Sequence, residues 1–310
     1  MERSRVRYAV VGLGHIAQVA VIPAFENASE NSELVALVSG DEDKLKALGE
    51  RHDVPLRRSY EDYDALLESG DIDAVYIALP NSMHRDYAVR AAEAGVHVLC
   101  EKPMAVTSAE CREMLDAADE NDVRLMIAYR LHFEEANLKA AEIVASEIGN
   151  PRIFSSVFTM SVKEGDVRLK KELGGGPLYD IGIYCINAAR YLFRDEPLSV
   201  SAIAASPDDS RFAEVPETVA VSMRFPGDRL ASFTASFGSA GTGSYRVIGT
   251  DGDLQLEPAY GYAVEMEHRL TVGGDTTRTK FDRRDQFAPE LIHFSKSVLE
   301  GTDPGPSGLE

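Results

Sequence analysis

Short apolar runs alternate with amphipathic stretches over roughly the first 130 residues of the chain. The runs are short and mostly apolar, as expected of strands that are buried on both faces of a sheet. The predicted strands cover 6–11, 34–38, 73–79, 96–99 and 124–128. The predicted helices between them run up to about Phe25 and then cover 43–52, 63–67, 84–94 and 108–121. This alternation predicts an α/β doubly wound parallel sheet, in which Gly95 ends one helix and Ser108 caps another.

The pattern changes after about residue 131. A helix predicted over 133–148 ends at Gly149-Asn150-Pro151, and strands of alternating polarity follow it. The clearest pair, 218–225 and 230–237, flanks a turn at 226–228 and predicts an antiparallel hairpin with one apolar face. Further predicted strands cover 153–161, 199–205, 245–248 and 253–256. We therefore predict a second domain of α+β type over residues 132–310, with a large, mainly antiparallel sheet.

A glycine pattern follows the first predicted strand. Gly12-x-Gly14-x-x-Ala17 opens the first helix, where Gly12 permits a tight turn and Gly14 lets a ligand approach the backbone. The pyrophosphate of a dinucleotide binds at the N-terminus of such a helix. The pattern is weak alone but fairly strong in this position, so residues 1–131 are predicted to form a Rossmann NAD(P)-binding domain.

The end of the second strand bears on which dinucleotide binds. NAD-binding chains usually place a carboxylate there, on the ribose 2′-hydroxyl. Here the strand ends in Val38-Ser39-Gly40, with Asp41 and Lys44 following. Ser39 and Lys44 suit a 2′-phosphate, whereas Asp41 favours NAD if it points inward. We predict NADP as the preferred cofactor and NAD as the alternative.

The net charge of the chain limits the kinds of partner that it can bind. The formal net charge is −19, which repels nucleic acid and anionic membranes, so neither is expected to bind. The acidic residues are scattered rather than gathered in a tail, and Trp is absent. This composition is typical of a surface solvated in a high-salt cytoplasm, and we hypothesise a halophilic origin.

Other compositional features exclude further classes. No stretch approaches the roughly 18 apolar residues of a membrane span, and the N-terminus has no signal-peptide core, which predicts a cytoplasmic protein. The widely spaced Cys100, Cys111 and Cys185 predict buried thiols rather than a disulfide framework or a zinc site. The histidines form no convincing metal cluster, and no metal is predicted.

Charged residues end one apolar strand abruptly. Glu101-Lys102-Pro103 follows the run 96–99, at the carboxyl edge where doubly wound sheets bind ligands. Charges at such a place are costly unless they are used. We therefore expect Lys102 to face the nicotinamide, with Pro103 fixing the turn, and a cis bond between the two is one expectation.

Two motifs resemble a known family over nearly the whole chain. Glu101-Lys102-Pro103 and the segment 174–184, GGGPLYDIGIY, are similar to the glucose–fructose oxidoreductase, inositol dehydrogenase and MocA (Gfo/Idh/MocA) family, with closest similarity to the first branch. Matching stretches also occur at 74–84, 128–132 and 167–169. The resemblance implies an NAD(P)-dependent oxidoreductase that acts on a sugar, a polyol or a related cyclic alcohol. It also implies a C-terminal helix that returns to the first domain, and we expect this chain to lack it.

The resemblance assigns roles by position. Lys102 matches the catalytic lysine and Asp180 the substrate-binding acid, while Tyr184 stands where most members have histidine and the glucose–fructose branch has tyrosine. The cofactor-binding residues expected in this way are Gly12, Gly14, His15, Ile16, Ser39, Lys44, Leu79, Pro80, Asn81, His84, Glu101, Lys102, Arg130 and Arg168. Those expected to bind substrate are Lys102, Arg130, His132, Asp180 and Tyr184.

The residue types suit alcohol oxidation. Asp180 and Tyr184 are four residues apart and share one face if their segment is helical. A free tyrosine hydroxyl titrates near about 10, and a nearby ammonium such as that of Lys102 stabilises the phenolate. We predict Tyr184 as general acid/base, Lys102 as its electrostatic partner and Asp180 as acceptor for a substrate hydroxyl. A cofactor-binding sensor or scaffold without turnover is the alternative.

Self-association is also expected. One face of the predicted hairpin carries small, weakly polar side chains, which suit close packing against another sheet. These residues are Thr218, Ala220, Ser222, Ser232, Thr234 and Ser236. We predict a homodimer or homotetramer.

Overall fold

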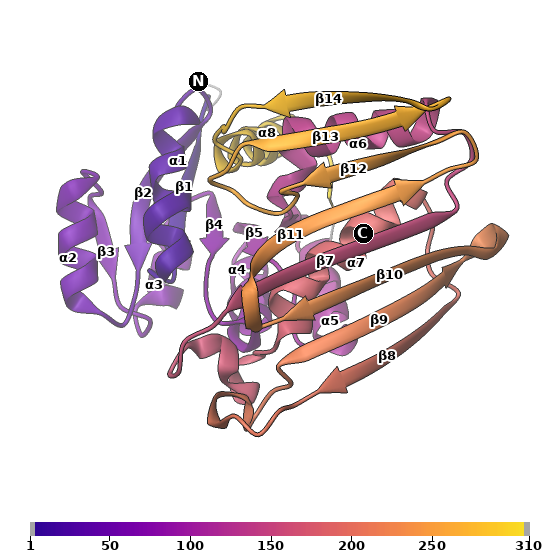
Figure 1. Cartoon of the computed structure of the whole chain (residues 1–310). Coiled ribbons are helices and arrows are strands. Elements are labelled where there is room, and N and C mark those ends of the chain that lie inside the picture. Colours follow the sequence, from indigo (N-terminus) through magenta and orange to yellow (C-terminus); the bar gives the residue numbers. More distant parts are fainter. Residues whose placement is uncertain (1–3, 307–310) are drawn as a thin grey trace. The chain divides into compact units, whose positions relative to one another are not determined.

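The computed structural model describes residues 4–306, and the chain divides into two compact units. The first comprises the chain up to Arg130 together with the segment from Asp285 onward, and the second covers Leu131–Arg284. The predicted boundary near residue 131 is therefore found, but the expectation that the whole C-terminal part belongs to the second domain is wrong. The last segment, which is drawn in yellow in Figure 1, belongs to the first unit instead.

The first unit is built on a parallel sheet. Within the described residues it has six strands in the order β3-β2-β1-β4-β5-β6, all paired in parallel, which is the Rossmann order. The strands are β1 (Val6–Val11), β2 (Ser32–Val38), β3 (Leu56–Arg58), β4 (Ala74–Ile77), β5 (His97–Glu101) and β6 (Leu125–Ala128). The doubly wound prediction is confirmed. Strand β3 was not predicted, because three residues are too few to show a periodicity.

Helices cover this sheet as the alternation predicts. They are α1 (Ile22–Asn27), α2 (Glu42–Arg51), α3 (Tyr63–Glu68), α4 (His84–Glu93) and α5 (Ser108–Glu120). Gly95 follows α4 with a φ of 74°, which agrees with its predicted role. The cap of α5, however, is Thr107 rather than Ser108, because Thr107 and Glu110 form a reciprocal capping box.

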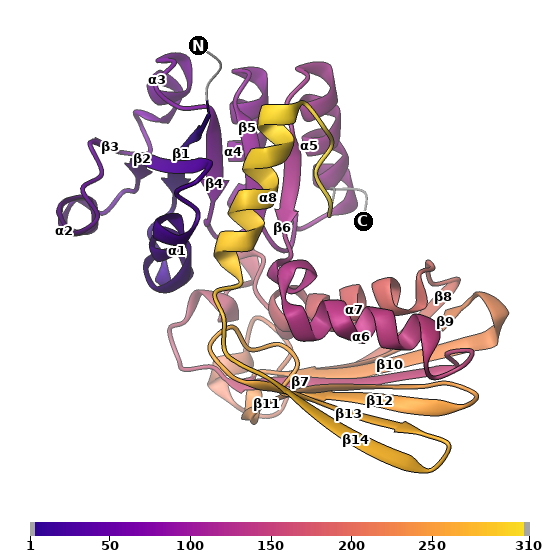
Figure 2. The same cartoon turned by 90° about the horizontal axis from the view of Figure 1, so that it is seen from above.

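A further helix, α8 (Phe287–Glu300), belongs to this unit and was not predicted. It packs on α1, β1 and β2, and the hydroxyl of Ser295 lies 2.6 Å from that of Tyr8 and 2.7 Å from that of Ser32. Figure 2 shows it in yellow alongside the sheet. The expectation that the chain lacks a returning C-terminal helix is therefore wrong.

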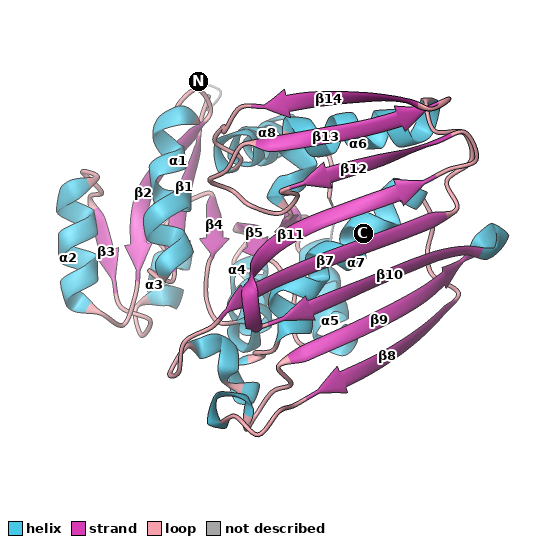
Figure 3. Cartoon of the chain, in the orientation of Figure 1, coloured by secondary structure: helices cyan, strands magenta, loops and turns pink. Residues whose placement is uncertain are grey.

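The second unit is built on a mainly antiparallel sheet. In the described chain it has eight strands in the order β14-β13-β12-β11-β7-β10-β9-β8, and the pair β7–β10 is parallel (Figure 3). The strands are β7 (Ile153–Ser161), β8 (Ser199–Ala205), β9 (Thr218–Phe225), β10 (Arg229–Ser236), β11 (Gly238–Ile248), β12 (Gly252–Glu257), β13 (Met266–Val272) and β14 (Asp275–Phe281). The predicted hairpin is the pair β9–β10, turned at Pro226–Asp228.

Two helices lie on one face of this sheet and leave the other face uncovered (Figure 2). They are α6 (Glu135–Ser146) and α7 (Ile183–Phe193). The alternation along β9 explains the arrangement, because Val219, Val221 and Met223 are buried while Ala220 and Ser222 are exposed. The helices thus cover the apolar face, and the small-residue face is open.

Two predictions about the chain as a whole are also tested. Cys100 and Cys185 are buried thiols, but Cys111 is only half-buried. Among residues 4–306, no helix combines the length and the apolar character needed to cross a membrane.

Candidate active site

The glycine loop of the first unit has the backbone of a dinucleotide-binding turn. Gly12 has a φ of 94°, and a Cβ there would lie 2.6 Å from the carbonyl oxygen of Ala78, so no other residue fits. A Cβ at Gly14 would meet no atom within 4 Å, which leaves this backbone open to a ligand. His15 is exposed beside it, and a π-helical turn, Ala17–Val21, leads into α1. The residues present therefore fit a pyrophosphate at this turn.

The end of β2 forms a polar edge of the first unit, at Ser39, Asp41 and Lys44. Asp41 accepts the backbone N–H of Lys44, and its carboxylate lies 3.1 Å from the Lys44 ammonium. The hydrogen bonds from Lys44 hold the pKa of Asp41 below its ordinary value. The Asp41 carboxylate thus serves as the cap of α2 and forms an ion pair with the Lys44 side chain.

Tyr60 is a neighbour of this edge that the sequence did not reveal. A Cβ on Gly40 would lie 3.2 Å from the Tyr60 ring, and burial raises the pKa of Tyr60 although Ser39 hydrogen-bonds to it. Tyr60 follows β3, which pairs in parallel with β2. Recognising β3 in the sequence would have placed Tyr60 beside Ser39.

The end of β5 places Glu101 and Lys102. Glu101 is the last residue of the strand, and its Oε1 accepts the hydroxyl proton of Tyr76 over 3.0 Å. Burial raises the pKa of Glu101, although Lys102 and Tyr76 oppose that shift. The Lys102–Pro103 peptide bond is cis, in agreement with the expectation.

His84 joins the loops that follow β4 and β5. It is fully buried, with Nδ1 2.9 Å from the carbonyl oxygen of Pro103 and Nε2 2.9 Å from that of Leu79. Burial lowers its pKa. Both ring nitrogens are thus engaged by the backbone, so His84 stabilises the turn that carries Lys102. Its expected contact with the dinucleotide stays a prediction.

A buried polar cluster lies near the same strand end. Arg130, which follows β6, is buried and donates from Nη1 to Oε1 of Gln286. Glu290, one turn further along α8, is completely buried, and neither of its carboxyl oxygens has a hydrogen-bond partner among the described residues. Burial and the charge of Glu101 raise the pKa of Glu290 well above its ordinary value, while Arg130 opposes them.

In the second unit, Asp180 forms an ion pair with Arg168. Nε of Arg168 donates to Oδ2 of Asp180 over 2.7 Å, and this carboxylate is the main cause of the raised pKa of Arg168. The glycine run 174–176 allows this ion pair to form. The N–H of Gly176 donates to the carbonyl oxygen of Arg168, and a Cβ on Gly175 would lie 2.4 Å from that same oxygen. The chain therefore folds back over Arg168 only because glycine stands there.

Asp180 and Tyr184 lie on one continuous helical segment, as predicted. A π-helical turn, Leu178–Gly182, carries Asp180 and leads directly into α7, which carries Tyr184. π-Helical turns occur frequently at functional sites. The Tyr184 ring is mostly buried, with the Phe158 ring centroid 5.8 Å away and that of Tyr260 6.1 Å away. Aromatic packing thus fixes the ring while the spacing aligns it with Asp180.

His132 is held against the same helix. Its Nε2 lies 2.8 Å from Oδ1 of Asn187, and its ring meets the edge of Tyr191 with centroids 5.3 Å apart. Asn187 and Tyr191 follow Tyr184 by three and seven residues, so they share its face. The structure thus brings His132 to the Asp180–Tyr184 face, whereas the neighbouring Arg130 belongs to the first unit.

The predicted residues therefore form two groups. The first unit holds the glycine loop, the edge at Ser39 and Lys44, and the segment Glu101–Lys102, while the second holds Asp180, Tyr184, Arg168 and His132. The part of the chain from residue 4 to 306 contains no group of three or more side chains arranged to hold a metal ion.

Comparison with known sequences gives consistent matches across both units. Residues 6–129 match the sequence model of the Gfo/Idh/MocA oxidoreductase family with an NAD-binding Rossmann fold, and residues 137–255 match the model of its C-terminal domain. D-xylose 1-dehydrogenase (NADP(+)) 2 of Haloferax volcanii is 34% identical over 302 residues, which cover 96% of this chain and 90% of that protein. The D-xylose 1-dehydrogenase [NADP(+)] of Haloarcula marismortui is also 34% identical, over 98% of this chain and 86% of that protein.

Solved structures agree with these matches. Aldose-aldose oxidoreductase from Caulobacter crescentus, complexed with glycerol, superposes with a TM-score of 0.93 at 37% identity and covers 98% of this chain and 92% of that one. A 3-ketoreductase from Actinomadura kijaniata, in complex with NADP and TDP-benzene, has a TM-score of 0.89 at 28% identity, with coverage of 98% and 93%.

Proposed function

The chain belongs to the Gfo/Idh/MocA oxidoreductase family, and from this premise we propose that it is an NADP-dependent sugar oxidoreductase. It transfers a hydride between the nicotinamide and a hydroxyl or carbonyl group of an aldose. The xylose dehydrogenases and the aldose-aldose oxidoreductase to which it is similar support this substrate class. They also argue against a sensor or scaffold without turnover.

The shared helical face of Asp180 and Tyr184 carries the proposal. A carboxylate and a phenol hydroxyl, aligned on one face and mostly shielded from water, offer an acceptor and a proton-transfer group to a polyhydroxylated substrate. Arg168 holds the carboxylate in place. A binding module without chemistry has no need for this arrangement.

The residues divide the work as follows. The bound nicotinamide supplies the hydride acceptor or donor. Tyr184 takes the proton from the reacting hydroxyl in oxidation and returns it in reduction. Lys102 stabilises the negative charge that develops on oxygen during this transfer, and Asp180 accepts a hydrogen bond from a substrate hydroxyl.

The preference for NADP follows from the end of β2. Lys44, its neighbour Ser39 and the ring of Tyr60 provide a cation, a hydroxyl and a flat wall for a 2′-phosphate, while Asp41 is used to cap α2. The side chain of Lys44 is half-exposed although it forms an ion pair with Asp41. We expect the enzyme to act in the cytoplasm.

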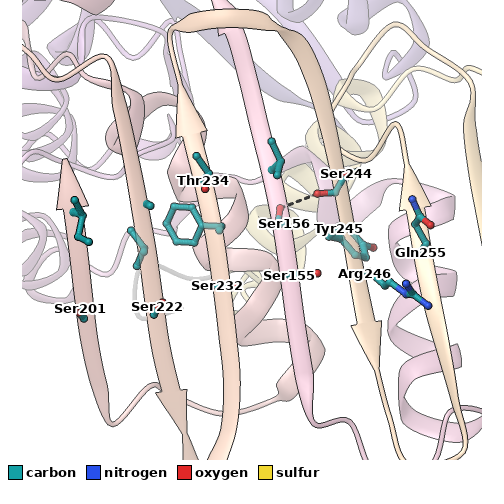
Figure 4. Close-up of a pocket in the computed structure, with 15 residues that line it drawn as sticks. Ser155, Ser156, Ser201, Ser222, Ser232, Thr234, Ser244, Tyr245, Arg246 and Gln255 are labelled. Carbon is teal, nitrogen blue, oxygen red and sulfur yellow. Dashed lines mark hydrogen bonds between the residues drawn. The ribbon is translucent and has the colours of Figure 1, made fainter. Parts of the chain in front are cut away.

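We also propose that the open sheet face of the second unit binds the same face of a second copy. A row of small residues crosses this face in register, Ser201, Ser222, Ser232 and Ser155, and lines a shallow hollow of about 550 Å³ (Figure 4). Exposed apolar side chains flank the row, namely Ile153, Val157, Ile203 and Leu230. Small and apolar residues together favour close contact between two sheets.

The direct test is cofactor reduction by a panel of sugars. Xylose, other aldoses, polyols and nucleotide-linked sugars are assayed by nicotinamide absorbance with NADP and NAD in parallel, at high salt. We expect turnover with an aldose and a higher kcat/KM with NADP. Cofactor binding without turnover of any sugar would favour the sensor instead.

A further inference from the structure

A buried side chain at the start of α8 holds Arg130. Nη1 of Arg130 donates to Oε1 of Gln286, and the two residues are only 5% and 4% exposed. A guanidinium has donors and no acceptor, so the oxygen of the amide, and not its nitrogen, faces Arg130. Gln286 stands at the N-cap position of α8, but its neighbour Asp285 makes the cap bonds, to the N–H groups of the first two helical residues. The Gln286 side chain is therefore turned to Arg130 rather than to the helix terminus.

The next carboxyl group on the same helix face makes no such bond. Glu290 follows Gln286 by four residues, is completely buried, and has no hydrogen-bond partner for either carboxyl oxygen in the described part of the chain. An ionised carboxylate would bind a guanidinium more strongly than an amide does. Burial and the charge of Glu101 instead favour the protonated form of Glu290 and raise its pKa, although Arg130 opposes them. This face of α8 thus offers Arg130 a neutral acceptor and no negative charge.

Arg130 follows the sheet at the edge where a dinucleotide is expected. It comes after β6 as Lys102 comes after β5, and these two strands pair in parallel. Both cations therefore follow the carboxyl ends of adjacent strands, where doubly wound sheets bind their ligands. The oxidised nicotinamide ring carries a positive charge, and the reduced ring carries none. A fixed cation at this edge therefore favours the reduced form of the cofactor.

We propose that Gln286 is a positioning residue of the enzyme, which holds the Arg130 guanidinium at this edge so that its charge favours binding of NADPH over oxidised NADP. The inference rests on the proposed function, because it takes NADP as the cofactor. Gln286 acts through Arg130. Its neutral amide is essential to this role, because a carboxylate in its place would hold the guanidinium and offset part of its charge. For a merely structural contact, either acceptor would serve.

The first measurement is the ratio of the dissociation constants of oxidised NADP and NADPH, obtained by titration calorimetry without any sugar. We expect Gln286→Glu to lower this ratio about 10-fold, because the new carboxylate keeps the hydrogen bond but offsets the charge of Arg130. Gln286→Met, which has no strong acceptor, should lower the ratio about 3-fold. Glu300→Gln, at the exposed end of α8, is the matched control and should leave the ratio unchanged. An unchanged ratio in Gln286→Glu would overturn the proposal.

The second measurement is a double-mutant cycle on the same ratio. Arg130→Met removes the charge and should lower the ratio at least as much as Gln286→Glu does, which itself removes no buried cation and decides the question even if Arg130→Met does not fold. In the Arg130→Met background, Gln286→Met should change the ratio by less than about 2-fold, because no guanidinium remains to be held. Additive effects would refute the positioning role.

The same titrations separate this role from the proposed function. If the wild type binds neither form of the cofactor, the two fall together. If it binds both forms and the ratio responds as expected, but no sugar is turned over, only the sugar oxidoreductase is refuted.

Discussion

Arg168 donates its Nε–H to Oδ2 of Asp180 across 2.7 Å, and this bond links two turns of the second unit that are twelve residues apart. Arg168 also receives support from Asp166, whose Oδ1 lies 3.4 Å from Nη1. The side chains of the pair are 37% and 21% exposed, so its contribution to folding is small. The pair instead orients Asp180, because the planar guanidinium of Arg168 fixes the direction of the carboxylate.

Removing this guanidinium should therefore damage catalysis more than folding. We expect Arg168→Met to lower kcat/KM for the sugar by about 10-fold, since a hydrogen bond to a charged group is worth about 1.5–3 kcal/mol. Arg168→Lys should recover only part of this loss. The matched control is Arg190→Met, which breaks the ion pair with Glu196 at the far end of α7 and should leave the kinetics unchanged. Wild-type kcat/KM in Arg168→Met would refute the role given to the pair.

The hydroxyl of Tyr184 should account for most of the turnover. Tyr184→Phe keeps the ring packing, so NADP affinity should remain, while kcat falls by the roughly 10²–10⁴-fold typical of a lost general acid/base. Tyr260→Phe changes the neighbouring ring in the same way and should have a much smaller effect. Steady-state kinetics measure both. Near-normal kcat in Tyr184→Phe would mean that Lys102 or His132, and not Tyr184, is the general acid/base.

Lys102→Ala should reduce kcat by a similar factor for a different reason. Without the ammonium, the negative charge that develops on the reacting oxygen loses its electrostatic partner. Steady-state kcat on the best aldose, measured beside the NADP affinity, gives the loss. Near-normal kcat would mean that Lys102 takes no part in the chemical step.

Lys44 should discriminate between the cofactors. Lys44→Ala removes the cation beside Ser39, and we expect NADP to bind about 10-fold more weakly with little change for NAD. Lys46→Ala, an exposed neighbour on the same helix, is the control. Fluorescence titration with each cofactor gives both constants. Equal losses for NADP and NAD would contradict the proposed contact between Lys44 and the 2′-phosphate.

The buried Glu290 predicts a pH dependence of stability. Its pKa in the folded state lies well above the ordinary value of 4.5, so the unfolded chain releases the proton first as the pH rises. Above about pH 4.5 the free energy of unfolding therefore falls by up to about 1.4 kcal/mol per pH unit. The fall ends when the pH reaches the pKa of Glu290 in the folded state. Glu290→Gln removes this loss, and we expect it to be as stable as the wild type near pH 4 and increasingly more stable towards pH 7. Urea unfolding at several pH values measures the difference.

A control for that series lies on the same helix. Glu300→Gln changes an exposed carboxylate at the end of α8 and should show almost no pH-dependent gain. If Glu290→Gln is no more stable than the wild type at pH 7, the folded protein offsets the cost of the buried Glu290 carboxyl, and the prediction is wrong.

The open sheet face should carry the contact between copies. Ser232→Glu places a charge in the middle of that face, on β10, and should convert the oligomer to monomers because a buried unpaired carboxylate is costly. Thr277→Glu, on the exposed edge strand β14, should not. Light scattering after size exclusion measures the mass of each. A wild type that is monomeric at working concentration would refute the interface.

Local patterns determined a large part of this protein. The apolar runs set β1, β4, β5 and β6, because strands buried on both faces need continuous apolar residues. Gly12 was recognisable because a left-handed turn at close backbone approach admits no Cβ. The alternation on β9 and β10 defined their two faces and their pairing. Each of these signals lies within about ten consecutive residues.

Only the tertiary structure decided the contacts between distant segments. Helix α8 belongs to the first unit because its contacts Tyr8 and Ser32 lie there, more than 250 residues earlier in the chain. Only the fold shows that the two ring nitrogens of His84 are engaged by the carbonyl oxygens of Leu79 and Pro103. Hydrogen bonds depend on where atoms meet in space, and the folding of the whole unit determines that. The sequence therefore indicated the candidate site residues, and the fold decided which neighbours hold their side chains.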